Sequence, residues 1–357
     1  MNPCKTYTEP KKKTRKMSAS SKQLWMLSII PIISVFIFSY VPMFGIILAF
    51  KRYNYSGGIF GSPWVGFENF RYLIESDNFY RIIRNTLVMN FLFILIGTIA
   101  AVGLALLLYR LTSRNKTKVY QTILITPNFL SWVVVAYMVY AILNPQHGVL
   151  NGILMRLGFE AVPWYGEPNA WPAILVIINV WKTVGMNSVI YYAAMMGIDE
   201  SQFEAARIDG ASDRQITRKI IIPGITGLII MMTILNIGNI FRADFGLFYQ
   251  IPRNVGKLYP TTDVIDTYIF RTLREDGNMG VSSAVGLLQS CVGFVLVVLT
   301  NTFVKMITDF FKNLLEDILR FFETGETSFD VEQTLKVMKI REGVIKAIGA
   351  PGAIIEL

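Results

Sequence analysis

Few residues in this 357-residue chain have the types and spacing that catalysis requires. The single histidine, His147, stands alone beside the Asn-Pro pair at 144–145, so no Ser/His/Asp arrangement is available. Cys4 lies in a polar tail and Cys291 in an apolar run, which excludes a zinc site or a disulfide framework. The Gly-Lys-Leu sequence at 256–258 lacks the other residues of a phosphate-binding loop. We therefore expect no metal or cofactor on this chain.

Polar side chains follow one face of an apolar segment over residues 171–197. They are spaced three or four residues apart, which places them on one side of a helix: Asn179, Lys182, Thr183, Asn187 and Tyr191. Lipid disfavours such a face, so it is expected to meet water, substrate or protein. Lys182 lies near the middle of the segment and needs a carboxylate or carbonyl partner. The row predicts a translocation path, and helix-to-helix hydrogen bonding is the alternative.

Other apolar segments add polar and aromatic residues. Ser131, Trp132 and Tyr137 lie in 119–142, and Asn236 and Asn239 lie in 221–241. Sugars are held by hydrogen-bonding groups and aromatic faces, so we add Trp132, Asn236 and Asn239 to the candidate pathway. Here too, bonding between helices is the alternative.

The segment from Asp199 to Ile225 reads DESQFEAARIDGASDRQITRKIIIPGI. Residues 203–208 predict a short amphipathic helix with Phe and Ile on its apolar side. Gly210 permits the left-handed turn that ends a helix, and Ser212 is a natural N-cap for a second helix over 213–221. Pro223 is expected to close this unit and start the next span. The pattern predicts a helix–turn–helix lying flat on the cytoplasmic face, where small alanines let a partner approach.

The pattern E-A-A-x-x-D-G, nine residues, then I-x-I-P resembles the coupling loop of importer-type ABC transporter permeases, the EAA loop. Ile222 stands where that loop usually has Leu, a change of shape and not of polarity. The resemblance implies that loop 199–223 docks into a separate ATPase subunit. The residues that it assigns to coupling are Glu204, Ala205, Ala206, Asp209, Gly210, Ile220 and Pro223.

The resemblance extends over about residues 22–308. VPMFGIILAFKRYN, SPWVGFENF, WKTVGMNSVIYYAAMMGID and TDVIDTYIFR are similar to the carbohydrate-uptake, maltose-permease-like branch. Within it, they most resemble complex-oligosaccharide permeases of the LplB and aldouronate type. The family often has an acid after the residue that matches Lys182, and this chain has Thr183 there.

This resemblance implies a type I importer in which the chain is not an enzyme. Its expected partners are a second homologous permease, two ATPase subunits that hold ATP and Mg, and an extracellular solute-binding lipoprotein that delivers the oligosaccharide. Another polar solute, such as a glycerol phosphate or an amino-sugar glycan, is the alternative cargo. A membrane receptor or scaffold without a transport role is the alternative from another class, and it would not copurify with an ATPase.

The elements that must position these residues are membrane spans. Only 17% of residues are charged, against about 25% in soluble domains. Six apolar segments are each long enough to cross the bilayer: 24–50, 83–109, 119–142, 171–197, 221–241 and 281–307. The sequence therefore predicts an all-α integral membrane protein with six transmembrane helices and a cytoplasmic coupling helix.

Basic residues set the predicted orientation. Tail 1–23 and connections 110–118 and 198–219 hold 15 Lys and Arg, whereas the alternate connections hold 11 in roughly twice the length. The positive-inside rule therefore places both termini in the cytoplasm of a bacterial cell, and the net charge of +9 indicates topology and not nucleic-acid binding. The long connections 143–170 and 242–280 would face outward, where they suit docking of an extracellular partner.

Three regions are expected: the basic cytoplasmic tail 1–23, the permease domain 24–308 and a cytoplasmic extension 309–357. In the extension, residues 309–323 predict an amphipathic helix of the membrane-surface type. A regulatory contact with the ATPases is the alternative role for this helix.

Overall fold

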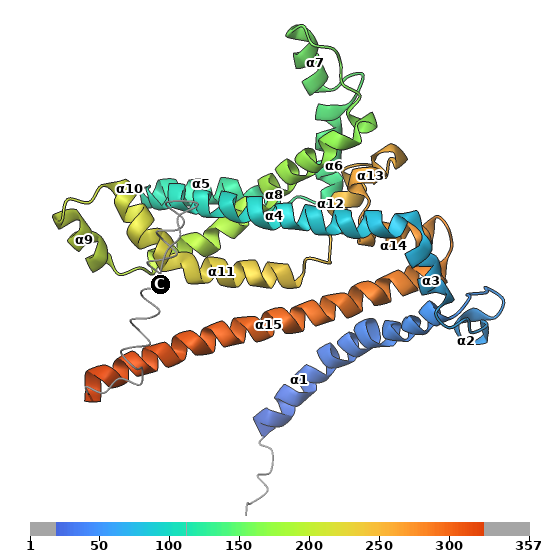
Figure 1. Cartoon of the computed structure of the whole chain (residues 1–357), viewed down its shortest axis with the longest axis horizontal. Helices are drawn as coiled ribbons and strands as arrows, with labels where there is room; N and C mark the ends of the chain where they lie inside the picture. Colours follow the sequence, from blue (N-terminus) through green and yellow to red (C-terminus); the bar gives the residue numbers. More distant parts are fainter. Residues whose placement is uncertain (1–18, 112, 325–357) are drawn as a thin grey trace, which may run out of the picture. The chain divides into compact units, whose positions relative to one another are not determined.

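The computed structural model describes residues 19–111 and 113–324 (Figure 1). Over these ranges the chain is helical, and the one strand-like pairing is an isolated bridge between Lys51 and Trp64. The predicted all-α fold is confirmed. Within the described ranges the chain divides into two compact units, the first formed by the part up to residue 83 with 264–290 and the second by 84–263 with the part from residue 291 onward. Residues 1–18 of the predicted basic tail, and the extension beyond 324, lie outside the described ranges.

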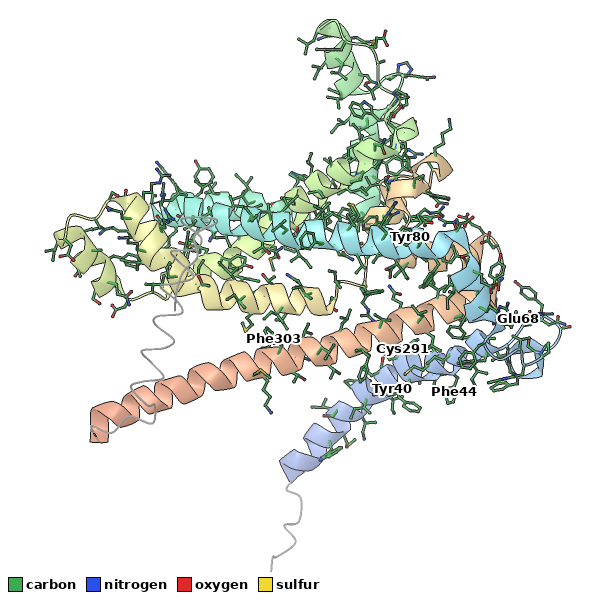
Figure 2. The ribbon with its side chains drawn as sticks, in the orientation of Figure 1. Tyr40, Phe44, Glu68, Tyr80, Cys291 and Phe303 are labelled. Atoms are coloured by element: carbon green, nitrogen blue, oxygen red, sulfur yellow. The ribbon has the colours of Figure 1, made fainter. Side chains whose placement is uncertain are left out.

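The first unit opens with the first span, which is helical from α1 (Ala19–Val35) through η1 (Phe36–Tyr40) to η2 (Val41–Phe50). Proline at the start of η2 has no N–H to donate, which favours a change of hydrogen-bonding pattern there. Tyr40 and Phe44 stand out from this helix with more than half of their surface exposed (Figure 2). Apolar side chains exposed along a helix of this length are expected where the surroundings are lipid.

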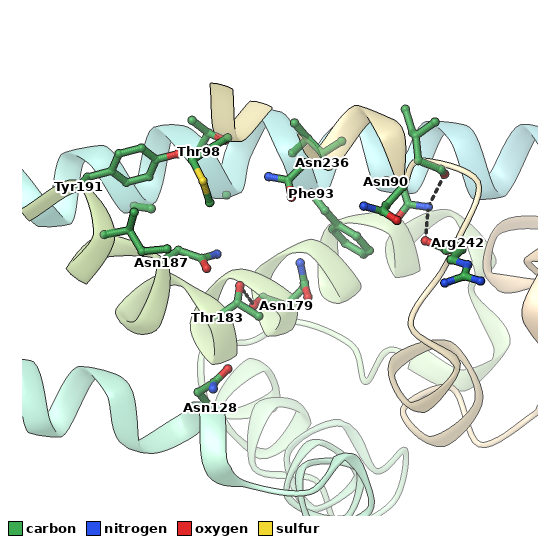
Figure 3. A pocket seen from close by; sticks show the side chains of 17 residues that line it. Asn90, Phe93, Thr98, Asn128, Asn179, Thr183, Asn187, Tyr191, Asn236 and Arg242 are labelled. Carbon is green, nitrogen blue, oxygen red and sulfur yellow. Dashed lines mark hydrogen bonds between the residues drawn. The ribbon is translucent and has the colours of Figure 1, made fainter. Parts of the chain in front are cut away.

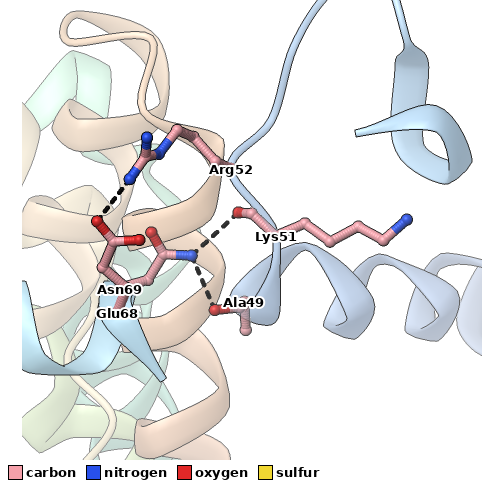
Figure 4. A network of polar contacts seen from close by, with 5 residues as sticks. All are labelled: Ala49, Lys51, Arg52, Glu68 and Asn69. Atoms are coloured by element: carbon pink, nitrogen blue, oxygen red, sulfur yellow. Dashed lines mark hydrogen bonds and ion pairs between the residues drawn. The ribbon is translucent and has the colours of Figure 1, made fainter. Parts of the chain in front are cut away.

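A hydrogen-bonded turn fixes the chain where it leaves the first span (Figure 4). The Lys51 ammonium donates to the carbonyls of residues 59 and 60, at 3.0 and 2.8 Å. The Asn69 amide donates to the carbonyls of residues 49 and 51, at 2.9 and 3.0 Å. These bonds satisfy a buried cation and anchor α2 (Gly58–Gly61) and α3 (Glu68–Glu75). The unit also contains α14 (Ile265–Arg274) and the start of the last helix.

The second unit is built on α4 (Asp77–Tyr109, which begins in the first unit), α8 (Trp171–Met196) and α11 (Ile222–Gly238). Shorter elements connect them: α7 (Val149–Arg156), η4 (Trp164–Gly166), η5 (Pro168–Ala170), α12 (Phe245–Gln250), η7 (Gly256–Leu258) and α13 (Tyr259–Thr262). Near the predicted cytoplasmic ends a buried cluster joins α4, α8 and α11 to the loop that follows α8: Ala101, Ala105, Tyr191, Met195, Phe203, Ile216, Ile221 and Ile225.

The third span is broken, so the prediction of one helix over 119–142 is wrong. The helix α5 (Arg114–Ile125) runs into the 3₁₀ turn η3 (Thr126–Phe129), and α6 (Trp132–Leu143) then leaves at an angle of 96°. Pro127 opens the turn because it lacks a donor, and the Ser131 hydroxyl caps the new helix by accepting from the Val134 N–H. The residues around Gly185 of α8 pack so closely on the Leu124 carbonyl that a Cβ would not fit.

Five other helical stretches are long and apolar enough to cross a membrane: 25–50, 77–109, 168–196, 213–238 and 279–306. The predicted number of six holds if the broken pair is counted as one span. The fifth span differs from its prediction, because α10 (Asp213–Ile216) continues through the π-turn η6 (Thr217–Ile221) into α11 without an interruption. Pro223 falls in the first turn of α11 and does not end the helix before it, since the wider π-turn accommodates it.

The last helix, α15, runs without a break from Met279 to Thr324. Residues 309–323 are helical, as predicted, but they continue the last span and do not form a separate helix. The reason lies in the sequence, because residues 294–324 contain neither glycine nor proline. The predicted domain boundary at 308 therefore does not coincide with a helix end. Within this helix, Phe303 stands exposed like the aromatic residues of the first span (Figure 2).

Candidate substrate pathway and coupling site

A cavity of about 330 Å³ lies inside the second unit, among α4, α8, α11 and the break of the third span (Figure 3). Its lining is rich in amides and hydroxyls: Asn90, Thr98, Asn128, Asn179, Thr183, Asn187, Tyr191, Asn236 and Asn239, with Arg242 as the one charged residue. Six of these were expected from the sequence, namely Asn179, Thr183, Asn187, Tyr191, Asn236 and Asn239. The structure thus brings the polar row of α8 and the asparagines of α11 to one cavity.

Four polar lining residues were not among the expected ones. Asn90 and Thr98 lie eight residues apart in α4, about two helical turns. Their spacing in an apolar segment could therefore have been used to predict that both face the cavity. Asn128 and Arg242 lie outside regular helix, at the break and after α11, where no periodicity marks them. Asn90 also joins α4 to the segment after α11, because its amide donates to the carbonyls of Ile240 and Arg242 at 2.7 and 3.1 Å (Figure 3).

Several amides in the cavity have hydrogen-bonding capacity to spare. The side chains of Asn128, Asn179, Asn187 and Asn236 make no hydrogen bond to protein within the described ranges. An amide offers both donors and acceptors, which matches the hydroxyl groups of a sugar. Polar groups inside a membrane protein are costly unless water or a ligand satisfies them. The cavity is therefore suited to a hydroxyl-rich solute.

Lys182 is not among the residues that line this cavity. It is buried, and its ammonium donates to three carbonyls at the break of the third span: Leu130 at 2.7 Å, Asn128 at 2.8 Å and Pro127 at 3.4 Å. The expected carbonyl partner is thus present. On a helix, successive residues differ by about 100°, so Lys182 faces the break while Thr183 faces the cavity.

Trp132 is likewise not among the lining residues, and it contacts Lys182 and Asp244. Its ring lies 5.0 Å from the Lys182 ammonium, within the range of a cation–π interaction. Its indole N–H donates to Asp244 at 2.7 Å, and the other Asp244 oxygen caps α12 by accepting from the Leu247 N–H at 3.2 Å. Gly246 leaves the indole ring room that a Cβ would occupy. Trp132 thereby joins the broken span to α12.

The predicted coupling loop contains the helix α9 (Glu200–Ile208), capped by Asp199. Phe203 is buried in the cluster described above and packs on Tyr109, whereas Glu204 and Ala205 are exposed. Ile208 is 86% exposed, so the prediction of a shared apolar side with Phe203 is wrong. Five residues apart, the two side chains point in directions about 140° apart. The exposed side of α9 therefore combines a carboxylate, a small residue and a large apolar one.

The turn after α9 follows its prediction. Gly210 has a φ of +76°, the left-handed conformation, and the N–H groups of residues 210 and 211 bond back to the carbonyls of residues 207 and 206. Ser212 and Gln215 form a capping box at the start of α10. A Cβ at Gly210 would meet nothing within 4 Å, so glycine is needed there for its backbone and not for space.

Comparison with known proteins gives the chain its context. Residues 93–316 match the family described as "Binding-protein-dependent transport system inner membrane component". The Bacillus subtilis (strain 168) protein LplB is 32% identical over 291 residues, which cover 81% of this chain and 91% of that protein. The polygalacturonan/rhamnogalacturonan transport system permease protein YteP of the same strain is 30% identical, over 80% of this chain and 88% of that protein.

Solved structures agree with these relatives. A crystal structure of a bacterial ABC transporter involved in the import of the acidic polysaccharide alginate contains a chain that matches with a TM-score of 0.73 and 32% identity. The match covers 81% of this chain and 97% of that one. A second structure shows the alginate transporter in complex with an alginate pentasaccharide-bound periplasmic protein, with a TM-score of 0.72. This chain therefore belongs to the family of binding-protein-dependent transport system inner membrane components and is a permease subunit of a carbohydrate ABC importer.

Proposed function

We propose that this permease forms, with a second homologous permease, the path by which an oligosaccharide or polysaccharide fragment crosses the membrane. The observation that carries this proposal is the cavity among α4, α8 and α11, where several amides have no protein partner within the described ranges. Its volume, about 330 Å³, falls within the usual range of ligand sites. A cavity of this size takes one part of a longer sugar at a time, and the partner permease would supply the opposite wall.

The cargo is supported by the chemistry of the cavity and by the relatives. Amide and hydroxyl groups suit sugar hydroxyls, whereas a glycerol phosphate would call for more cations than the single Arg242. One named relative is a polygalacturonan/rhamnogalacturonan transport permease, and the solved structures concern the import of alginate. We therefore favour a polysaccharide fragment over the alternative solutes.

The remaining partners follow from the same proposal. Two ATPase subunits would hold ATP and Mg and dock on loop 199–223, and a solute-binding lipoprotein would deliver the sugar from outside. The structure of the alginate transporter with its loaded periplasmic protein supports an assembly of this kind. The exposed side of α9, with Glu204, Ala205 and Ile208, provides a surface for the ATPase.

A first prediction concerns the sugar path. Asn187→Ala and Asn236→Ala should each raise the sugar concentration for half-maximal uptake about 2- to 10-fold, the value of one neutral hydrogen bond. Assembly and basal ATPase activity should be unchanged. Tyr191 needs the milder Tyr191→Phe, because its ring is part of the buried cluster. Thr233→Ala in α11 is the control, since that hydroxyl bonds to its own helix and lies outside the cavity. Lower yields of complex with unchanged apparent affinity would remove these residues from the path.

A second prediction concerns coupling. Gly210→Val should reduce sugar-stimulated ATP hydrolysis and uptake together, because a β-branched residue in the left-handed conformation costs about 1–2 kcal/mol or more. Gly210→Asn is the matched control, since asparagine tolerates this conformation and no neighbour opposes a side chain. Both rates should be measured in proteoliposomes together with retention of the ATPase subunits. Normal uptake by the Gly210→Val complex would contradict the coupling role.

A third prediction concerns orientation, for which we propose that both termini are cytoplasmic. With Cys4 and Cys291 replaced by serine, a cysteine at Glu160 should react with an impermeant maleimide on intact cells. A cysteine at Lys116 should react only after the cells are opened. Both positions are exposed, so access to the reagent depends on the side of the membrane. Labelling of the Lys116→Cys protein in intact cells would overturn the topology.

A further inference from the structure

A second cavity, of about 240 Å³, lies between α6 and residues 249–254, which are the end of α12 and the turn that follows it. It shares no lining residue with the central cavity and is formed by Val133, Ala136, Tyr137, Tyr249, Gln250, Arg253 and Asn254. Residues 249–254 belong to the connection that the sequence predicts to face outward. Neither the polar row of α8 nor the coupling loop contributes to this cavity.

The one charged side chain of this lining is a fixed arginine. The Arg253 guanidinium lies 4.1 Å from the centre of the Tyr140 ring, which orients it by a cation–π contact. The Tyr165 ring packs edge-on against Tyr140, with 5.6 Å between the ring centres, and burial raises the pKa of Tyr165 to about 12. The phenol therefore remains neutral and gives Arg253 no counter-ion. Within the described ranges Arg253 forms no ion pair, and the lining contains no carboxylate.

The backbone that presents Arg253 is strained. Arg253 and Asn254 have φ values of +56° and +52°, and they are the only non-glycine residues with positive φ in the part of the chain that the structure describes. Two consecutive left-handed residues are costly, and such strain concentrates at functional sites. The turn is held by the Tyr259 hydroxyl, which donates to the Asn254 side-chain oxygen at 3.0 Å.

The rest of the lining supplies ring faces and an amide. Tyr137 is 66% exposed, and Tyr249 stacks on Phe245 at 4.9 Å. The Gln250 side chain is half-buried and makes no protein hydrogen bond within the described ranges. Aromatic faces pack against the apolar side of a sugar ring, and planar amides bond its hydroxyls. A lipid phosphate would pair with the Arg253 guanidinium, but it would not require the Gln250 amide or the tyrosine rings.

We propose that this second cavity is an entry subsite for a uronic-acid unit of the transported saccharide. The Arg253 guanidinium would pair with the sugar carboxylate, Tyr137 and Tyr249 would contact the ring, and Gln250 would bond a hydroxyl. The inference rests on the proposed function, since it adds a substrate class to the same cargo. A planar guanidinium is suited to bidentate pairing with a carboxylate, which a neutral sugar cannot provide.

The test is a binding measurement on the assembled transporter in phosphatidylcholine nanodiscs, without the binding protein. The probes are trigalacturonate and its fully methyl-esterified form, which differ in charge and share one backbone. The unmodified complex should bind the acid about tenfold more tightly than the ester, the value of one charge-assisted pair. Arg253→Gln should abolish this preference for the acid, so that the two probes bind equally, and Arg253→Lys should keep part of the preference. Tyr137→Ala should weaken both probes and leave the ratio unchanged.

Arg156→Gln is the matched control, because Arg156 is an exposed arginine of α7 outside this cavity. Three results would overturn the subsite. They are an unchanged acid-to-ester affinity ratio in Arg253→Gln, equal binding of the two probes to the unmodified complex, and binding of neither probe. If Arg253→Gln leaves the affinity ratio unchanged but weakens the binding of anionic lipid to the complex, the arginine is assigned to lipid and the subsite is overturned. Uptake in proteoliposomes with the binding protein separates the two proposals. If no oligosaccharide is transported, the proposed function is wrong. If transport is normal but Arg253→Gln leaves the acid-to-ester affinity ratio unchanged, only the subsite is wrong.

Discussion

The ammonium of Lys182 and the three carbonyls at the break of the third span solve two problems at once. A broken helix inside a membrane leaves carbonyls without their helical partners, and each such group costs several kcal/mol when unsatisfied, on the order of 2–7 in an apolar medium. A lysine near the middle of a span is costly for the same reason, by about 2.5–3.5 kcal/mol on insertion scales. The bonds of 2.7 and 2.8 Å from Lys182 to Leu130 and Asn128 satisfy both groups together.

The position of the site follows from this interaction. Because the third span breaks at residues 130–131, Asn128 reaches the central cavity, and α6 leaves at 96°. Trp132 then lies between Lys182 and Asp244, which begins α12. The same bend carries Tyr137 and Tyr140 of α6 toward Arg253. Lys182 thus helps to position both cavities. It holds the break that places Asn128 at the central cavity, and it contacts Trp132 at the start of α6, which lines the second cavity.

Much of the site could be predicted because it depends on local patterns. A four-residue spacing was enough to place Asn179, Thr183 and Asn187 on one face of α8, and the turn at Gly210 followed from the conformational freedom of glycine. The break of the third span could not be predicted from hydropathy, because residues 119–142 are mostly apolar with only scattered polar residues, and a single proline does not always end a helix. A carbonyl or carboxylate partner was expected for Lys182, but which groups it bonds could not be predicted, since main-chain carbonyls carry no sequence signal. Helix ends were harder to predict. The α10–α11 helix continues past Pro223, and α15 continues past the end of its apolar segment, so neither a proline nor the end of an apolar run marked the end of the helix.

We predict that Lys182 is a structural cation that positions the pathway and does not touch the sugar. The most direct measurement is the yield and thermal stability of the purified Lys182→Met complex, together with the apparent sugar affinity of the molecules that assemble. Leaving the carbonyls unsatisfied should cost about 1–3 kcal/mol or more, so yield and melting temperature should fall while the surviving complexes keep a normal affinity. Lys182→Arg retains donors and should recover part of the stability. A Lys182→Met complex of normal yield and stability with a strongly weakened sugar affinity would contradict the account.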